Sequence, residues 1–326
     1  MRLCANARLL TSKTKPLSAL EPKSLLNVSK TAPVLLLHGF MQHASTWQCV
    51  AESLSKTRDV YALEFPTKPR VANVLYWRRG CTSGVPTTEV FELSSQAANC
   101  ESEVGEQAVN NQCTLDAMSN ACMQLAATLP QKPIVVGYSM GGRVAVNALV
   151  NSGAARFAHT CEALVLESAG LGPENESAQK RAAANSNAIA TRLRTCASLA
   201  AFVDWWEGLP LFQTQQRLAH AVLQSVREER LNNNVDILVN LVENAGQHCM
   251  PARSAVKCAL QALANNNFPT LYIAGALDKK YSAFARWLEQ QSLADVVIVP
   301  GAGHNVHLEA REEFLKIIIN ACNHVI

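Results

Sequence analysis

A serine stands between two glycines in the segment Gly137–Gly141, which reads Gly-Tyr-Ser-Met-Gly. An apolar, strand-like run precedes it, and a run with helical character follows from residue 142 to 150. In a strand–turn–helix of this kind the sharp turn lifts the serine hydroxyl out of the backbone, where a base can reach it. Larger residues two before or two after the serine would collide in so tight a turn. The pattern predicts a nucleophilic or basic serine at Ser139.

A serine hydroxyl does little chemistry until another group takes its proton. Asp278 follows an apolar run at 271–274, and His304 follows another at 296–299. The order serine, acid, histidine along the chain is one of the known arrangements of a Ser–His–Asp triad. We therefore expect His304 to take the proton of Ser139, and Asp278 to orient His304. The alternative for Asp278 is a surface acid without a catalytic role, and the alternative for His304 is a histidine that only forms part of a turn.

His307 competes with His304 for the role of base, and the His-x-x-His spacing raises the question of a metal. No third ligand follows nearby in the sequence, so we expect neither a metal nor another cofactor. His304 directly follows Gly-Ala-Gly at a strand exit, which favours it as the base. We assign His307 to packing or to capping of the next helix.

A reaction that develops an oxyanion needs two preorganised N–H donors. The backbone N–H of Met140, directly after the serine, is one candidate. The N–H of Phe40 is the other, because it follows Leu37-His38-Gly39 at the end of an early strand. We expect His38 to brace that loop and to take no catalytic part.

Arg143 lies four residues after Ser139, which places it one helical turn along on the same face. A guanidinium beside the reacting centre could bind a carboxylate through two parallel hydrogen bonds. The alternative is a surface arginine paired with an acid. The position favours a small anionic substrate.

The bulk properties exclude several classes of protein. The net charge of +3 over 326 residues is too small and too dispersed to indicate nucleic-acid binding. No apolar run approaches the roughly 20 residues that a membrane span needs. The 11 cysteines form no Cys-x-x-Cys pair and no cluster with zinc spacing. A long chain without a recognisable secretory signal is expected to be reduced and cytoplasmic. The first 30 residues are basic, and an organelle-targeting segment is the alternative to a solvated arm. The sequence gives no oligomeric state.

Short apolar runs alternate with helical patterns along most of the chain, which predicts an α/β fold with a doubly wound, mostly parallel sheet. The expected strands are 34–37, 60–65, 134–136, 163–166, 270–274 and 296–299. The expected helices include 115–129, 142–150, 281–290 and 311–322.

Two segments depart from this alternation. Residues 67–111 are long and polar, which indicates an inserted excursion or loop. Residues 171–267 show helical stretches and no convincing strand, which predicts a helical cap over the sheet end where ligands bind. The core would then comprise 1–170 and 268–326.

This layout resembles the α/β-hydrolase superfamily. The segment Gly137–Arg143 further resembles the MenH family, the 2-succinyl-6-hydroxy-2,4-cyclohexadiene-1-carboxylate synthases of menaquinone biosynthesis. Segments 202–212, 230–234 and 302–309 resemble that family as well. The sequence departs from the family pattern in the excursion 67–111, where the family usually has a short loop.

The resemblance implies a cofactor-independent lyase that removes pyruvate from 2-succinyl-5-enolpyruvyl-6-hydroxy-3-cyclohexene-1-carboxylate. It also implies substrate-binding roles for five residues: Tyr138, Arg143, Arg181, Trp206 and Arg230. Arg181 is the weakest match. Two alternatives stay open at this point. One is a serine hydrolase of esters, lactones or C–C bonds with the same triad, and the other is a binding module without catalysis.

Overall fold

The computed structural model describes residues 31–65, 71–80, 85–92 and 113–323. An eight-stranded sheet forms its centre, in the order β4-β3-β2-β1-β5-β6-β7-β8. The strands are β1 (Val34–Leu37), β2 (Val60–Leu63), β3 (Val71–Trp77), β4 (Thr87–Glu92), β5 (Ile134–Tyr138), β6 (Ala163–Glu167), β7 (Thr270–Gly275) and β8 (Asp295–Val299). The six strands predicted from the apolar runs are confirmed, and their ends differ by at most two residues.

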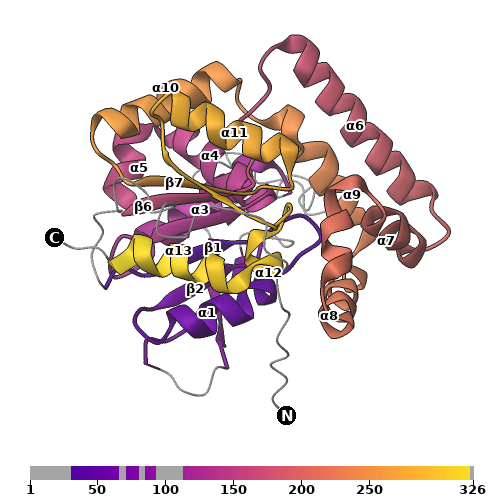
Figure 1. Cartoon of the computed structure of the whole chain (residues 1–326), viewed down its shortest axis with the longest axis horizontal. Helices are drawn as coiled ribbons and strands as arrows, with labels where there is room; N and C mark the ends of the chain where they lie inside the picture. Colours follow the sequence, from indigo (N-terminus) through magenta and orange to yellow (C-terminus); the bar gives the residue numbers. More distant parts are fainter. Residues whose placement is uncertain (1–30, 66–70, 81–84, 93–112, 324–326) are drawn as a thin grey trace, which may run out of the picture.

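Strands β1, β2, β5, β6 and β7 are buried on both faces, which explains their nearly continuous apolar sequences. Alternate residues of β1 point to opposite layers: Leu35 and Leu37 join one hydrophobic cluster, and Val34 and Leu36 join the other. One layer consists of α3 (Leu115–Thr128), α4 (Met140–Ser152), α5 (Ala154–Thr160), α10 (Arg253–Asn265) and α11 (Lys279–Gln290). The other consists of η2 (Ala44–Trp47), α1 (Gln48–Leu54), α12 (Val306–Glu309) and α13 (Arg311–Asn323). Figure 1 shows these helices on the two sides of the sheet.

The interpretation of 67–111 as an excursion or loop is wrong for the part that the structure describes. Strand β3 pairs antiparallel with β2 and with β4, so this part extends the sheet at one edge. Edge strands are partly exposed and carry polar residues, here Thr87, Thr88 and Glu89, which hides the strand pattern. Residues 93–111 lie outside the described residues.

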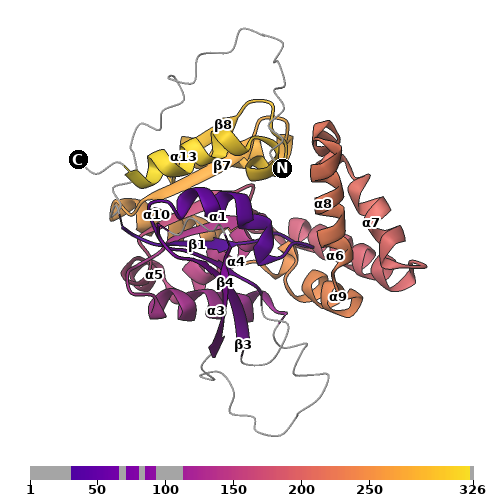
Figure 2. The same cartoon turned by 90° about the horizontal axis from the view of Figure 1, so that it is seen from below.

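A helical layer lies at one end of the sheet, as both views show (Figures 1 and 2). It contains α6 (Glu176–Thr195), α7 (Leu199–Glu207), η3 (Pro210–Arg217), α8 (His220–Leu231), α9 (Val235–Asn244) and η4 (Gln247–Cys249). These helices have a hydrophobic cluster of their own, which includes Phe202, Leu238 and Val239. Met41, from the loop after β1, is 1% exposed and belongs to the same cluster. The cap is thus fastened to the core by an apolar side chain.

Helix α10 falls within the predicted cap range 171–267, but it packs against α4 and α5. Its buried residues Val256, Leu260 and Leu263 belong to the cluster that covers the sheet. By packing, the cap therefore ends before α10. The division into a core and a cap remains a proposal.

Candidate active site

Ser139 occupies the turn between β5 and α4 with φ 49° and ψ −101°, a conformation that costs a non-glycine residue free energy. The turn is held by its surroundings. The Ser139 N–H donates to the carbonyl of Glu167 at 2.9 Å, and a Cβ on Gly141 would lie 2.2 Å from the carbonyl oxygen of Leu37. Only glycine fits there, as the sequence pattern predicted. The hydroxyl is lifted clear of the strand.

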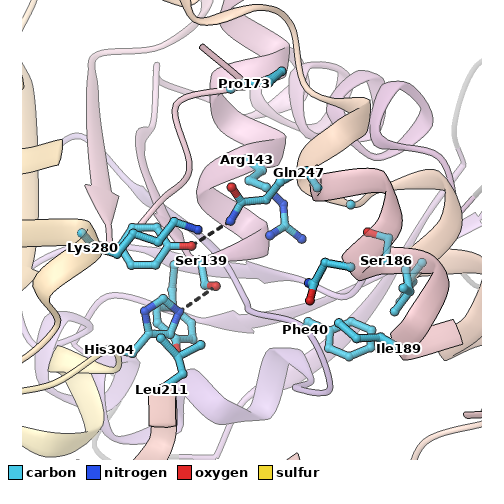
Figure 3. A pocket seen from close by; sticks show the side chains of 18 of the residues that line it. Phe40, Ser139, Arg143, Pro173, Ser186, Ile189, Leu211, Gln247, Lys280 and His304 are labelled. Atoms are coloured by element: carbon cyan, nitrogen blue, oxygen red, sulfur yellow. Dashed lines mark hydrogen bonds between the residues drawn. The ribbon is translucent and has the colours of Figure 1, made fainter. Parts of the chain in front are cut away.

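The structure brings the three predicted triad residues together. His304 Nε2 lies 3.0 Å from Ser139 Oγ (Figure 3). His304 Nδ1 lies 2.7 Å from Asp278 Oδ2. The other oxygen of Asp278 accepts the N–H of Tyr281 at 3.1 Å, so the carboxylate also caps the start of α11. His304 and Asp278 are both buried. This geometry allows proton transfer from Ser139 to His304.

The two proposed oxyanion donors follow β1 and β5, which are adjacent parallel strands. Met140 is the first residue of α4, so its N–H has no partner within the helix. Phe40 lies in the loop after β1. The side chain of Gln42, in the same loop, accepts the N–H of Gly39 at 2.8 Å. Phe40 lines the same cavity as Ser139. The oxyanion roles of both residues remain predictions.

His38 braces this loop, as expected. It is buried, its Nδ1 lies 2.9 Å from the Gly39 carbonyl oxygen, and its Nε2 lies 3.3 Å from Glu64 Oε1. His307 packs between Trp47 and Tyr138 and pairs with buried Glu167. Within the described ranges, no group of three or more His, Cys, Asp or Glu residues is placed to hold a metal.

A cavity of about 620 Å³ lies between the cap and the sheet, next to the triad. Its wall includes Phe40, Ser139 and His304 from the core, and Trp206 and Phe212 from the cap. Among the residues that the structure describes, five cationic side chains line it and no Asp or Glu does. They are Arg143, Arg181, Arg230, Arg253 and Lys280. Such a wall favours an anionic ligand.

Arg143 extends from α4 into the space that Ser139 and His304 also face (Figure 3). Burial lowers the pKa of its guanidinium, although an arginine remains charged at any ordinary pH. Its Nε is buried and has no hydrogen-bond partner in the part of the chain that the structure describes. A buried cationic donor without a partner is costly, so a bound anion would stabilise this position.

Arg230, near the end of α8, is held by neighbours in the cap. Its Nη1 lies 3.0 Å from Glu207 Oε1, its Nη2 donates to Gln215 at 3.3 Å, and its guanidinium lies 5.0 Å from the ring centre of Phe212. Arg230 is 7% exposed. It is therefore prearranged at the cavity wall, and Glu207 neutralises part of its charge.

The remaining predicted binding residues lie at different depths of the site. Arg181 lines the cavity but is exposed, and it donates to Ser177 Oγ at 2.7 Å. Trp206 packs against Phe40 and Phe212 at ring distances of 5.3 and 5.5 Å, so it builds the cap and lines the cavity at once. Tyr138 is buried beneath the triad, and burial raises the pKa of its phenol well above its ordinary value.

Several lining residues were not singled out as binding residues from the sequence, among them Gln247, Arg253, Lys280 and Tyr281. Gln247 Nε2 donates to the Tyr281 hydroxyl at 2.8 Å, which joins the cap to α11 beside Arg143 (Figure 3). Lys280 could have been found, because it lies two residues after Asp278. Gln247 and Arg253 carry no local signal, since packing of the cap brings Gln247 to the cavity and packing of α10 on the core brings Arg253 there.

Comparison with known proteins places this architecture in a family. A family model described as "Alpha/beta hydrolase family" matches residues 34–317. The chain therefore belongs to the α/β-hydrolase family. Within that family, its relatives include proteins named 2-succinyl-6-hydroxy-2,4-cyclohexadiene-1-carboxylate synthase, as the MenH resemblance predicted.

A relative from Bacillus subtilis (strain 168), with that name prefixed "putative", is 32% identical over 185 residues, which are 56% of this chain and 63% of the relative. A Salmonella typhimurium relative is 32% identical over 202 residues, 60% of this chain and 71% of its own length. The match thus spans somewhat less than two thirds of the Bacillus protein.

The solved structures show the same fold. MenH from S. aureus superposes with a TM-score of 0.68 at 22% identity, over 91% of this chain and 96% of that one. An enol-lactonase from Burkholderia xenovorans LB400 superposes with a TM-score of 0.61 at 17% identity, over 91% of this chain and 93% of that one.

No helix in the described part of the chain is both long and apolar enough to cross a membrane.

Proposed function

We propose that the protein is a carbon–oxygen lyase of menaquinone biosynthesis. It would eliminate pyruvate from 2-succinyl-5-enolpyruvyl-6-hydroxy-3-cyclohexene-1-carboxylate and form 2-succinyl-6-hydroxy-2,4-cyclohexadiene-1-carboxylate. The observation that carries the proposal is a cavity beside the triad whose described lining has five cationic and no acidic side chains. A substrate with several carboxylates suits that wall. The names of the relatives support the same reaction.

The bond changes follow from the substrate and the product. A 3-ene becomes a 2,4-diene when ring carbon 2 loses a proton and the C5–O bond breaks. The C–H electron pair forms the new double bond at carbon 2, the old double bond moves to carbon 4, and the enolpyruvyl oxygen leaves with the C5–O pair. The leaving enolate regains a proton and becomes pyruvate. Only proton transfer is needed, so the reaction requires no cofactor.

In this proposal Ser139 takes the ring proton while His304, 3.0 Å away, takes the proton of the hydroxyl. Asp278 stabilises the resulting imidazolium, which returns its proton to the leaving group. Ring carbon 2 adjoins the succinyl ketone, so negative charge develops on the ketone oxygen. The backbone N–H groups of Phe40 and Met140 would stabilise that charge.

The cationic side chains would position the substrate. Arg143 lies one turn from Ser139 with a buried Nε that has no partner among the described residues, and it would bind a carboxylate next to the reacting ring. Arg230 and Arg181 would hold further carboxylates from the cap. Trp206 and Tyr138 would form apolar walls around the ring. Binding energy from these groups would orient the ring for proton transfer.

A second candidate is a serine hydrolase of esters, lactones or C–C bonds. The observation in its favour is the Ser139–His304 hydrogen bond, which would serve acyl transfer equally well. A hydrolase of this kind forms a covalent acyl-enzyme, and its mechanism assigns no role to Arg143.

Pyruvate release from the cyclohexene substrate by the purified protein tests the proposal, with Ser139→Ala as the matched control. Release that disappears in the variant supports the lyase. Turnover of aryl esters without pyruvate release would support the hydrolase in its place.

A further inference from the structure

Glu167, the last residue of β6, is a fully buried carboxylate that the triad does not use. Its two oxygens accept hydrogen bonds from a single residue. The backbone N–H of His307 donates to Oε1 at 3.0 Å, and His307 Nδ1 lies 2.7 Å from Oε2. Burying a carboxylate is costly unless donors replace its water. These two contacts therefore bind β6 firmly to the segment that carries His307.

The backbone of Glu167 holds the nucleophile. Its carbonyl accepts the N–H of Ser139 at 2.9 Å, and in the sheet it pairs with Tyr138, the residue before the serine. Ser139 has a strained backbone conformation, which persists only where the surroundings impose it. One residue thus contacts the serine turn through its main chain and the histidine loop through its side chain.

The histidine loop also has an internal support. Glu309, at the end of α12, accepts the N–H groups of Gly303 at 2.8 Å and Asn305 at 3.2 Å, the two neighbours of His304. Glu309 belongs to the same loop and helix, so it fixes the loop's own shape. Glu167 comes from another strand, so it fixes where that loop lies relative to Ser139.

We propose that Glu167 is a positioning residue that sets the separation of Ser139 Oγ and His304 Nε2. The inference rests on the proposed roles of Ser139 and His304, but it does not depend on the identity of the substrate. Proton transfer requires these atoms within hydrogen-bond reach. A misplacement of about 1 Å can cost on the order of 100-fold in rate.

The first test is Glu167→Gln, in which an NH₂ group replaces one acceptor and faces a donor of His307. We expect kcat to fall about 10- to 100-fold while KM changes less than about twofold. The control is Ile318→Ala on α13, a buried position whose truncation destabilises the protein without contacting Glu167, Ser139 or His304 in the described structure. If kcat of Glu167→Gln stays within about twofold of the wild type, or if Ile318→Ala lowers kcat equally, the proposal is overturned.

A second pair of variants covers the case in which Glu167→Gln does not fold. His307→Asn places an amide N–H near the position of Nδ1, whereas His307→Leu has no donor there. We expect His307→Asn to retain most of the wild-type kcat and His307→Leu to lose most of it. Equal values for the two would contradict the proposal.

Hydrogen–deuterium exchange of residues 303–308 gives a readout that needs no substrate, and we expect faster exchange in His307→Leu than in His307→Asn. Unchanged exchange in this segment would overturn the proposal. If the wild type releases no pyruvate but hydrolyses aryl esters, the lyase proposal fails, and the same variants are compared by kcat on the ester.

Discussion

Arg143 and Ser139 belong to the same first turn of α4, and the N–H of Arg143 donates to the carbonyl of Ser139 at 3.1 Å. Ser139 and Arg143 are therefore joined through the backbone at the start of α4, and both line the cavity. A carboxylate bound by Arg143 would be held at a fixed distance from Ser139. This coupling gives the first prediction.

Replacing Arg143 by Ala should leave the fold intact and lower kcat/KM for the anionic substrate by roughly 100-fold or more. Arg143→Lys should recover part of the loss, because the charge remains and the two-pronged geometry does not. Steady-state pyruvate release measures both variants, with circular dichroism as the check on folding. A kcat/KM for Arg143→Ala equal to that of the wild type would rule out the carboxylate role.

Asp278→Asn should lower kcat on the order of 10⁴-fold, because the amide favours the wrong tautomer of His304. The Tyr281 N–H can still donate to the amide oxygen, so thermal unfolding should change little. Single-turnover kinetics measures the chemical step separately from product release. A loss below about tenfold would mean that His304 does not depend on Asp278.

How well the sequence predicted the molecule depended on whether each signal was local. The Gly-x-Ser-x-Gly turn, the strand ends before Asp278 and His304, and the buried strands are all local patterns, and the structure confirms where they lie. Gln247 reaches the cavity through packing of the cap, and Arg253 reaches it through packing of α10 on the core. Glu167 reads as an ordinary strand end, because its partner His307 lies 140 residues away.

Met41→Ala should weaken the attachment of the cap to the core. Met41 is buried in the cap's hydrophobic cluster, and truncation of a buried methionine costs about 2–5 kcal/mol. Urea unfolding measures the loss, and tryptophan fluorescence reports on Trp205 and Trp206, which pack beside this cluster. Identical unfolding curves for the variant and the wild type would show that Met41 contributes nothing to cap attachment.

The pair His43–Glu64 should make stability depend on pH. The hydrogen bond to Glu64 raises the pKa of His43 above its ordinary 6.5, although burial opposes the shift. Burial also opposes ionisation of Glu64, but the charge and hydrogen bond of His38 and the hydrogen bonds of His43 and the Ala44 N–H hold its pKa well below 4.5. Glu229 of α8 accepts the backbone N–H of His43 at 3.1 Å, and its charge also raises the pKa of His43.

The sign of each contribution follows from these directions. The stabilisation from His43 is complete below pH 6.5 and is lost as pH rises through its raised pKa. The stabilisation from Glu64 is present above pH 4.5 and is lost as pH falls toward its lowered pKa. The difference in unfolding free energy between the wild type and Glu64→Gln should therefore be largest between pH 4.5 and 6.5. Denaturant titrations across that range measure it, and a constant difference would contradict the pairing.

The central claim is that an α/β-hydrolase triad performs elimination on a polycarboxylate. The most direct measurement compares, in one preparation, kcat/KM for pyruvate release from the cyclohexene substrate with kcat/KM for an aryl ester. We expect pyruvate release within about 10⁴–10⁸ M⁻¹s⁻¹, the range of enzymes on their own substrates, and ester turnover far below it. Both should vanish in Ser139→Ala. Efficient ester turnover with no pyruvate release would contradict the claim and establish a serine hydrolase.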